Sequence, residues 1–483
     1  MLSGAELKPR LKKIFHKNVV ADKDYQVGSI SALDLLSARR LDLIPKYIYA
    51  KYKLMGVASD FPNKIYCDHI KAFNNFVEND EELKVGESDF LEKYNTLLDS
   101  IKSDGFSDLY PVPINYSGDV LDGAHRVAAC LALSEPVRFV SLDVESPSYD
   151  YSYFLNRGLS VSTLDFIALN YVRLVDSSKV VILWPSAKGR VEEVESILRG
   201  YGDVVYRKSV SFSDVGQHNI TRLAYKNEEW LGSYRDDFLG AKNKADWCFS
   251  EDGPAIIYLI DSVGDLVEMK EKIRELFGVG KHSVHINDTY SESLELSECL
   301  FNKNSLNVLN CGRFVEFKWF DKLFLHYRSW IEKNGYDKES FCIDGSGSLA
   351  VVGVRDVRDL DYLCFSHEVR CTGYKEIDCH NSGFSHKKVS IDDVVFDSEN
   401  YFYHDGLKFV SLELVRSLKI LRGEVKDKED VANLDTLLSG AKIKADYREL
   451  FIKFFSITYI KARIKLVALK LRYHLYRLRK GVG

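Results

Sequence analysis

Four residues near the end of the third quarter of the chain have types and spacing suited to phosphate chemistry. Gly345 and Ser346 are followed by Asp359 and Asp361. Residues two apart on a strand point to the same face, and two carboxylates on one face repel each other unless a cation lies between them. Mg²⁺ is the natural cation, because carboxylates and phosphate oxygens together hold it. A Gly-Ser turn admits a phosphate close to the backbone, so we expect phosphoryl transfer here.

Further residues are expected to complete this site. Asp378 is the first candidate for a third carboxylate and Asp392 the second. Downstream basic residues are candidates for phosphate contacts, because Lys and Arg are the usual phosphate partners: Lys408, Arg416, Lys419 and Lys426. The alternative for these basic residues is a solvated helix face. The alternative for the whole segment is an exposed loop in which Arg355 and Arg358 pair with Asp356 and Asp359.

A second motif lies near the N-terminal end, in the sequence VLDGAHRVAACLAL. Asp122 and Gly123 form an expected tight turn, and His125 and Arg126 fall in the first turn of an expected helix over 124–134. Free backbone N–H groups at a helix start, together with an Arg, make an anion site. His125 can add a hydrogen bond or move a proton. The alternative is a capped helix with a surface Arg.

Two weaker clusters leave metal binding open. His282 and His285 precede Asp288, and this segment is interpreted either as a metal site or as a loop that holds an anionic acceptor. Four residues lie within sixteen positions, but their spacing matches no common zinc knuckle: Cys371, Cys379, His380 and His386.

The elements that position these motifs are expected to mix short strands with amphipathic helices, which indicates α/β and α+β domains. Around the second motif we expect a mainly helical stretch up to about residue 60, a strand over 64–70, a helix over 88–106 capped by Ser88, a hairpin over 111–123 and a strand over 137–144. The middle region alternates strands and helices in a β-α-β pattern. Residues 406–439 are expected to be helical with one break.

The composition of the chain limits the classes of protein to which it can belong. The chain has 483 residues, 46% of them hydrophobic, a net charge of −5 and nine cysteines without a CxxC pair. It is long enough for several domains, and the odd, irregular cysteines favour a reducing cytosol. No signal peptide and no membrane-spanning stretch is expected. The acidic balance makes nucleic acid an unlikely partner.

The last residues differ from the rest. From Leu450 onward there are nine Lys or Arg and no acid, and apolar residues recur at spacings of three and four between Ile460 and Leu478. A basic helix with an apolar stripe is suited to a membrane surface. We therefore expect residues 450–480 to contact lipid; the alternative is a helical hairpin packed on the body.

The order of elements around Asp122-Gly123 and His125-Arg126 resembles the ParB/sulfiredoxin-like family over about Lys64–Val144. The family binds nucleotides at such a turn; some members are partition CTPases with DNA-binding helices, and others are small-molecule kinases. The Asp-Gly-x-His-Arg form is more similar to the kinases. The resemblance implies that Asp122, Gly123, His125 and Arg126 contact nucleotide phosphates and that Asp122 acts on an acceptor hydroxyl.

The Gly-Ser turn followed by Asp-x-Asp resembles the nucleotidyltransferase superfamily, closely over Phe341–Leu363 and loosely to about Ser439. The resemblance implies a mixed-sheet domain in which Asp359 and Asp361 are catalytic and hold Mg²⁺. The expected domains are then a helical extension (1–60), a ParB/sulfiredoxin-like domain (61–150), an α/β middle region (175–335), a nucleotidyltransferase-like domain (336–445) and a basic amphipathic tail (446–483).

Together the two motifs predict a bifunctional enzyme of phosphoryl or nucleotidyl transfer. Its expected cofactors are Mg²⁺ and a nucleoside triphosphate, ATP or CTP, and its acceptor is a small molecule or a glycan. The expected setting is bacterial surface-polysaccharide assembly, in the cytoplasm or peripherally on the membrane. The alternatives are a ParB-like protein that binds CTP and DNA and carries a modifying domain, and a scaffold in which neither site turns over.

Overall fold

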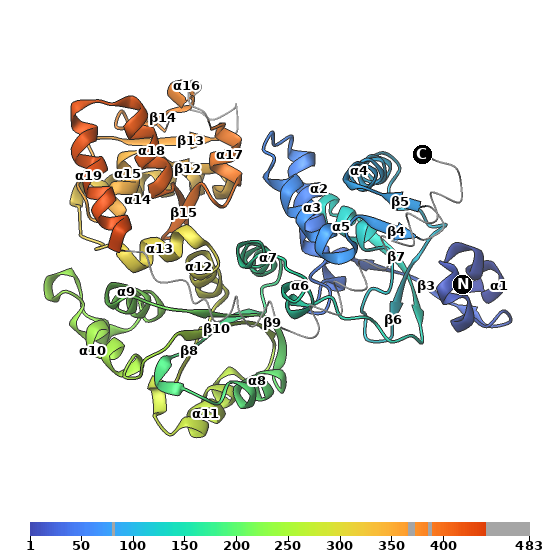
Figure 1. The fold of residues 1–483 in the computed structure, drawn as a ribbon. Helices are drawn as coiled ribbons and strands as arrows, with labels where there is room; N and C mark the ends of the chain where they lie inside the picture. Colours follow the sequence, from blue (N-terminus) through green and yellow to red (C-terminus); the bar gives the residue numbers. More distant parts are fainter. Residues whose placement is uncertain (80–82, 366–371, 385–388, 441–483) are drawn as a thin grey trace, which may run out of the picture. The chain divides into compact units, whose positions relative to one another are not determined.

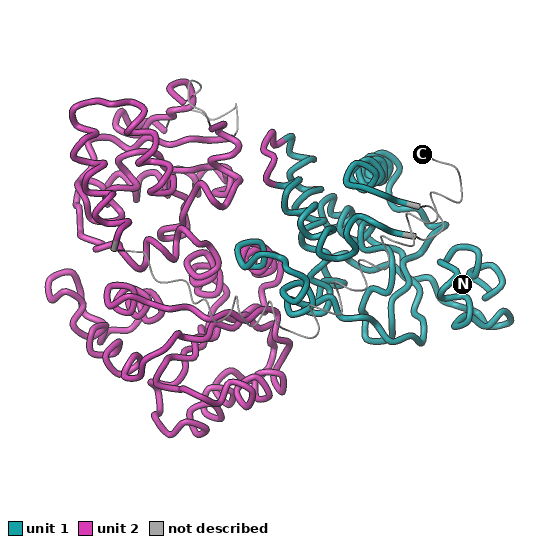
Figure 2. Tube along the Cα trace, viewed as in Figure 1, with its two compact units in different colours: residues 1–56, 62–164, 444–483 teal, residues 57–61, 165–443 magenta. Residues whose placement is uncertain are grey.

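The computed structural model describes residues 1–79, 83–365, 372–384 and 389–440. It is a mixed α/β protein, 53% helical and 17% strand, as the sequence predicts for the fold class (Figure 1). The described residues form two compact units, one of residues 1–56 and 62–164 and the other of residues 57–61 and 165–440 (Figure 2). The N-terminal extension and the segment around His125 therefore share one unit, and the middle and C-terminal regions share the other.

The first unit is built around a small sheet. Its three strands are in the order β3-β7-β6, with β3 and β7 antiparallel and β6 and β7 parallel. Its elements are β1 (Leu2–Ser3), α1 (Gly4–Leu7), β2 (Asp24–Tyr25), β3 (Val27–Ser31), α2 (Leu43–Met55), α3 (Phe61–Asn74), β4 (Val77–Asn79), β5 (Leu83–Val85), α4 (Glu87–Asp104), β6 (Val112–Asn115), α5 (Ala124–Leu133), β7 (Pro136–Leu142) and α6 (Tyr151–Leu155). The chain passes into the second unit within α7 (Val161–Leu174).

Several local predictions for the first unit are confirmed, and others are wrong. The helix over 124–134 is α5 and the strand over 137–144 is β7. The expected strand over 64–70 is instead part of helix α3, because Ile65, Tyr66, His69 and Ile70 are all buried at helical spacing. Helix α4 starts at Glu87, so its N-cap is Gly86 rather than Ser88. The first 60 residues include three short strands among their helices.

The second unit begins with a four-stranded sheet in the order β11-β8-β10-β9. The expected alternation of strands and helices is confirmed, but every pairing in this sheet is antiparallel, so it contains no parallel β-α-β unit. The reason is visible in β8 and β10, whose Val180–Leu183 and Ile257–Ile260 are buried on both faces. Such continuous apolar runs are typical of parallel strands, and here helices cover an antiparallel sheet instead. The elements are β8 (Ser178–Leu183), α8 (Val191–Arg199), β9 (Gly202–Val210), α9 (Asp214–Ala224), α10 (Leu239–Cys248), β10 (Ala255–Ser262), α11 (Leu266–Phe277), β11 (Val284–Ile286), α12 (Tyr290–Leu300) and α13 (Lys303–Cys311).

The second sheet of this unit is mixed, with strands in the order β14-β13-β12-β16-β15. Its central strand β12 pairs with β13 antiparallel and with β16 parallel. The expected helix over 406–439 is wrong at its start, where Leu407–Val410 forms β16, but the expected single break is confirmed and lies at Gly423. The elements are α14 (Lys318–Lys333), β12 (Phe341–Ile343), α15 (Ser346–Val351), β13 (Leu360–Cys364), β14 (Ile377–Cys379), α16 (Asn381–Phe384), α17 (Ile391–Phe396), β15 (Tyr401–His404), β16, α18 (Leu412–Arg422) and α19 (Val425–Gly440).

Candidate functional site

A pocket of about 370 Å³ lies at one end of the mixed sheet of the second unit. It brings together Gly345, Ser346, Asp359, Asp361 and Lys419 from the sequence-based predictions, and Lys426 as well. The other lining residues are Asp344, Arg355, Arg358, His380, Val415, Leu418, Arg422, Glu429 and Asp430.

The Gly-Ser turn is fixed by local backbone geometry. Strand β12 ends at Ile343, and Gly345 turns the chain into helix α15 with φ +59° and ψ −110°, a conformation that favours glycine. Gly347 packs against the sheet so closely that an added Cβ would lie 2.4 Å from Cγ2 of Ile343. The backbone N–H of Asp344 donates to the carbonyl of Asp361 at 2.9 Å. The pairing of β12 with β13 therefore places the turn beside the Asp-x-Asp segment.

Three carboxylates form an acidic wall of this pocket: Asp344, Asp359 and Asp361. Burial raises the pKa of Asp361, and the charges of Asp359, Asp344 and Asp378 raise it further. Nδ1 of His380 lies 3.3 Å from Oδ2 of Asp344. Within the described ranges, the carboxylates of Asp359 and Asp361 make no ion pair. Asp359 and Asp361 therefore bring acidic charge to the pocket without an ion-pair partner among the described residues.

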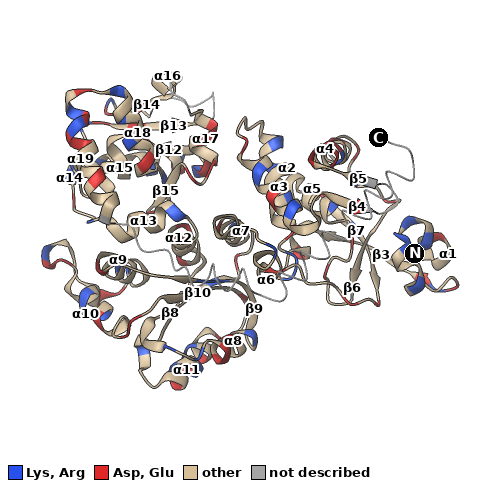
Figure 3. Cartoon of the chain, viewed as in Figure 1, with Lys and Arg blue, Asp and Glu red and all other residues tan. Residues whose placement is uncertain are grey.

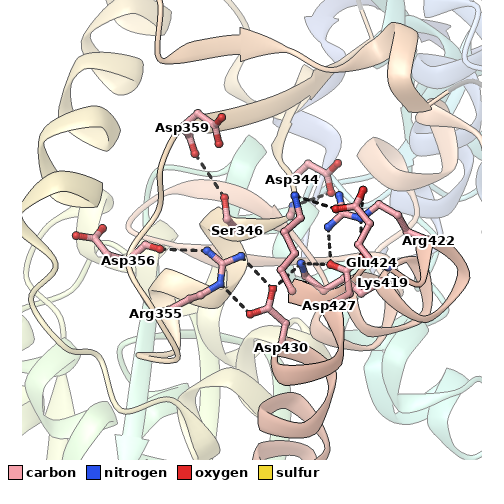
Figure 4. A network of polar contacts seen from close by, with 12 residues as sticks. Asp344, Ser346, Arg355, Asp356, Asp359, Lys419, Arg422, Glu424, Asp427 and Asp430 are labelled. Atoms are coloured by element: carbon pink, nitrogen blue, oxygen red, sulfur yellow. Dashed lines mark hydrogen bonds and ion pairs between the residues drawn. The ribbon is translucent and has the colours of Figure 1, made fainter.

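Cations from α18, from the loop before β13 and from the start of α19 form a facing basic wall. Lys419 pairs with Asp430 at 2.7 Å and with Asp427 at 3.2 Å. Arg355 makes a bidentate contact with Asp430: its Nε donates to Oδ1 at 2.8 Å and its Nη2 donates to Oδ2 at 3.0 Å. Figure 4 shows this network beside Asp344, Ser346 and Asp359. The cations are thus held in place by acids of α19, and Arg358 and Lys426 add charge at the pocket.

Four predicted residues lie outside the lining of this pocket. The ammonium of Lys408 is buried, 3.0 Å from a carboxylate oxygen of Glu339, and it also donates to the carbonyl of Val395. Arg416 pairs with Asp435 on the exposed face of α18. Asp378 is exposed on β14, and Asp392 accepts from the backbone N–H of Ala58. The structure does not bring these four side chains to the Gly-Ser turn.

Sequence reasoning missed Asp344, which is 4% exposed and belongs to the acidic wall. The signal was present: Asp344 directly follows a short apolar strand and directly precedes the Gly-Ser turn. Arg358 was also missed as a pocket residue. Arg358 was weighed only as a partner of Asp359, and the two make no ion pair within the described part of the chain.

The fit of Mg²⁺ to the acidic wall can be judged from the donor set. Among the described residues, no group of three or more His, Cys, Asp or Glu side chains is arranged to hold a metal ion by itself. Mg²⁺ sites, however, use one or two protein carboxylates and take their remaining oxygens from phosphate and water. Asp359 and Asp361 supply such a pair, so the wall fits Mg²⁺ that arrives with a nucleotide. The His282 and Cys371–His386 clusters contain no such group in the described ranges, and Cys371 and His386 themselves lie outside them.

The first unit holds a separate cavity of about 460 Å³ at the start of α5, lined by Asp122, Gly123, His125 and Arg126. Gly123 has φ +85° and precedes α5, which favours glycine. Leu11 and Phe15 pack against Val140 and Leu142 of β7. This packing positions Lys12, whose ammonium is 2.7 Å from Asp122.

The residues at this turn already bind one another. Asp122 also lies 3.8 Å from the guanidinium of Arg126, which donates to the carbonyl of Tyr110. Nε2 of His125 is 2.9 Å from the hydroxyl of Tyr66. Burial, helped by the charge of Lys46, holds the pKa of His125 well below its usual range. His125 is therefore a neutral hydrogen-bonding group at pH 7, and an anion at this turn must compete with Asp122 for Lys12 and Arg126.

Beneath the turn lies a buried charge triad that the sequence did not indicate. Asp42 accepts two hydrogen bonds from Arg40, at 2.8 and 3.0 Å, and one from Lys46 at 3.0 Å. All three side chains are 3% exposed or less. Burial opposes ionisation, but Arg40 and Lys46 hold the pKa of Asp42 well below its usual range. The triad gives the floor of the cavity one excess positive charge.

Charge over the rest of both units is mixed, with Lys and Arg interspersed among Asp and Glu (Figure 3). In the part of the chain that the structure describes, no helix is both long and apolar enough to cross a membrane. The expected membrane-binding segment, residues 450–480, lies outside the described residues.

Comparisons with known proteins leave both resemblances as interpretations of the motifs. The chain matches no family model. No curated protein and no solved structure shows significant similarity to it. The case for function therefore depends on the two pockets themselves.

Proposed function

We propose that this chain is an Mg²⁺-dependent transferase of phosphorus-containing groups, with its active site in the 370 Å³ pocket of the second unit. The observation that carries the proposal is the charge arrangement of that pocket. One wall contains Asp359 and Asp361, whose carboxylates make no ion pair with a described residue, and the other contains cations that are mostly held by acids of α19. A metal–nucleotide complex has the matching arrangement, with a cation beside an anionic phosphate chain.

The residues divide the work by charge and position. Asp359 and Asp361 hold Mg²⁺, with Asp344 as the third carboxylate of the wall, and the metal neutralises phosphate charge when bound. Gly345 and Ser346 supply a close backbone approach and a hydroxyl to a phosphate. Lys419, Arg422 and Arg358 bind the remaining phosphate oxygens. We assign the third carboxylate to Asp344 rather than to Asp378, because Asp344 lines the pocket and Asp378 does not.

A second nucleotide site is proposed in the first unit, at the Asp122-Gly123 turn. Its support is the excess positive charge of the buried triad together with Lys12 and Arg126 at the start of α5. There, Asp122 and neutral His125 are placed to contact an acceptor hydroxyl. This is the expected kinase module, and ATP or CTP is its expected ligand.

The biological setting remains the one predicted from the sequence. A transferase with a small-molecule or glycan acceptor, working at the membrane in surface-polysaccharide assembly, accounts for both sites and for the basic tail. The alternative is a CTP- and DNA-binding protein with a modifying domain. The mixed charge of the described surface gives no support to a large DNA footprint.

The test is a nucleotide panel with full-length protein and Mg²⁺. ATP, CTP, GTP and UTP are assayed for binding and turnover in wild type, Asp359→Asn/Asp361→Asn and Arg126→Ala. We expect the double variant to lose at least 1000-fold in transfer, and Arg126→Ala to weaken nucleotide binding in the first unit only. Asp435→Asn is the matched control, because Asp435 is an exposed acid of α19 outside the pocket.

Two further variants decide the third carboxylate. We expect Asp344→Asn to lose transfer and Asp378→Asn to keep most of it. Transfer that survives in Asp359→Asn/Asp361→Asn would overturn the proposed active site. CTP hydrolysis that depends only on Arg126 and is stimulated by DNA would favour the alternative function.

A further inference from the structure

The middle region of the second unit contains a cavity that neither motif explains. Its volume is about 780 Å³, about twice the 370 Å³ of the proposed active site. Helices α9, α10, α11 and α12 and strand β11 contribute its lining, and the residues of the two cavities do not overlap. Figure 1 shows these helices on the antiparallel sheet, in the green to yellow part of the chain.

Aromatic rings line this cavity from two sides. Trp247 stacks on the ring of His282, with centroids 5.5 Å apart and planes at 30°. Tyr225 contacts Trp230 at 5.3 Å and His285 at 4.8 Å. Trp247 is 64% exposed and Trp230 is 45% exposed, which is unusual for the largest apolar side chain. Exposed rings beside a cavity offer stacking faces to a ligand.

A cation without a carboxylate partner lies among these rings. Lys244 donates to the backbone carbonyl of Lys281 at 2.6 Å and lies 3.4 Å from Nδ1 of His282. In the described ranges no carboxylate oxygen is within 4.0 Å of its ammonium. Burial lowers the pKa of Lys244, which is the cost of a cation that lacks a counter-charge.

The other charges of the cavity are mostly matched within the protein. Lys270 pairs with Asp288 at 2.6 Å, and Lys226 pairs with Glu295. Glu292 accepts from the backbone N–H groups of Asp288 and Thr289 at the start of α12. Arg274 pairs with Glu271 through its terminal nitrogen, but its Nε is buried without a hydrogen-bond partner among the described residues. Lys244 and Arg274 therefore leave donor capacity at the cavity.

We propose that this cavity binds a small phosphorylated ring compound, of the class of a sugar phosphate or a nucleoside monophosphate. The phosphate supplies the counter-charge for Lys244 and an acceptor for Arg274. The ring stacks against Trp247 or Trp230. The neutral imidazole of His285, whose pKa burial lowers to about 4, lines the same space and offers one donor and one acceptor to hydroxyl groups.

This inference goes beyond the proposed transferase activity and does not depend on it. Its test is calorimetric titration of the full chain without Mg²⁺. The probes are glucose 1-phosphate, uridine 5′-monophosphate, glucose, uridine and inorganic phosphate. We expect one of the two phosphorylated ring compounds to bind at least tenfold more tightly than its unphosphorylated parent and than inorganic phosphate. The compound that does so identifies the ligand as a sugar or a nucleoside.

Variants assign the binding to this cavity. We expect Lys244→Gln to weaken binding at least tenfold, and Trp247→Ala to weaken binding of the ring compound but not of inorganic phosphate. Lys242→Gln is the matched control, because Lys242 is exposed on the same helix and does not line the cavity. Binding should persist in Asp359→Asn/Asp361→Asn and in Arg126→Ala. The result for this cavity can therefore be distinguished from the results for the other two pockets. The proposal is overturned if no probe binds wild type, or if Lys244→Gln binds as wild type does.

Discussion

The two phosphate-type pockets differ in how their charges are compensated. In the first unit, Asp122 is bound by Lys12 and Arg126, and Asp42 below it is bound by Arg40 and Lys46. In the second unit, the carboxylates of Asp359 and Asp361 make no ion pair with a described residue. The first pocket is preorganised by its own ion pairs, so an anion that binds there would have to exchange with Asp122. The second keeps acidic charge that a metal ion would neutralise.

The largest expected effect comes from breaking the compensated triad of the first unit. Asp42→Asn leaves Arg40 and Lys46 buried without their carboxylate, and removal of one partner from a buried pair costs about 3–5 kcal/mol. We expect this loss in the free energy of unfolding, measured by urea denaturation followed by far-UV circular dichroism. A loss below about 1 kcal/mol, typical of surface pairs, would show that the triad is not the charge centre of this unit.

The next effect is a pH dependence of the first unit. Burial holds the pKa of His69 and of His125 well below 6.5. Both stay neutral in the folded protein while the unfolded chain takes up protons below pH 6.5, so stability falls as the pH drops from 6.5 toward 5. The expected loss is about 1 kcal/mol per histidine for each pH unit.

The measurement is the urea midpoint at pH 7.5, 6.5 and 5.5 in wild type and in His69→Leu. Both ring nitrogens of His69 lack a hydrogen-bond partner among the described residues, so leucine removes the titration without breaking a bond. We expect a shallower pH slope in the variant. An unchanged slope would mean that His69 takes up its proton in the folded protein.

A smaller effect compares the two glycine turns. An added Cβ at Gly123 would lie 2.7 Å from Nη2 of Arg126, whereas at Gly345 it would meet nothing within 4 Å. Both have positive φ, so each change to alanine costs about 1–2 kcal/mol in backbone strain. We expect only Gly123→Ala also to displace the Arg126 guanidinium and weaken nucleotide binding. Thermal unfolding and equilibrium binding of both variants test this difference.

The smallest expected effect is on the free energy of unfolding, which should stay unchanged or rise, whereas Asp42→Asn should lower it. Asp361→Asn removes a carboxylate that burial and Asp359 disfavour, so we expect unchanged or slightly higher stability, by less than about 1 kcal/mol. For the same reason, the ionised carboxylate of Asp361 lowers the free energy of unfolding at neutral pH. This loss disappears on acidification, when Asp361 takes up a proton at its raised pKa. All five tryptophans lie in the second unit, so fluorescence-detected unfolding isolates this effect. A clear destabilisation would show that Asp361 is already paired in the folded protein.

Much of the local structure around both motifs was predictable, because it depends on nearby residues. Helix α5 follows from Gly123 and an apolar run, and the Gly-Ser turn follows from short strands around it. Helix α3 was mistaken for a strand because seven residues of Lys64–Ile70 fit both periods, and only the longer pattern from Phe61 decides for the helix. The antiparallel middle sheet was unpredictable for another reason: its central strands β8 and β10 are buried on both faces and carry no alternation.

For the site residues too, what depends on nearby sequence was predictable and what depends on distant partners was not. Asp359, Asp361, Gly345 and Ser346 are close in sequence and were found. Lys408 was predicted to contact phosphate, but its ammonium pairs with the buried Glu339. The sequence around Lys408 does not indicate this distant partner. The triad of Arg40, Asp42 and Lys46 was missed, since charged residues in a helix start normally indicate a solvated surface. Burial of charge is set by tertiary packing, which a single sequence does not display.

The strand order of the C-terminal sheet has a consequence for how the proposed active site forms during folding. Strands β12 and β13 are near neighbours in sequence, so the acidic wall of Asp344 and Asp361 needs only a short loop closure. Lys419 and Arg422 of the basic wall lie on α18, which follows β16, and β16 joins β12 only after a much longer stretch of chain. Non-local pairings form more slowly than local ones. On a newly made chain the acidic half of the pocket should therefore exist first, and Mg²⁺ or another divalent cation in the cell would meet it before the phosphate-binding half is in place.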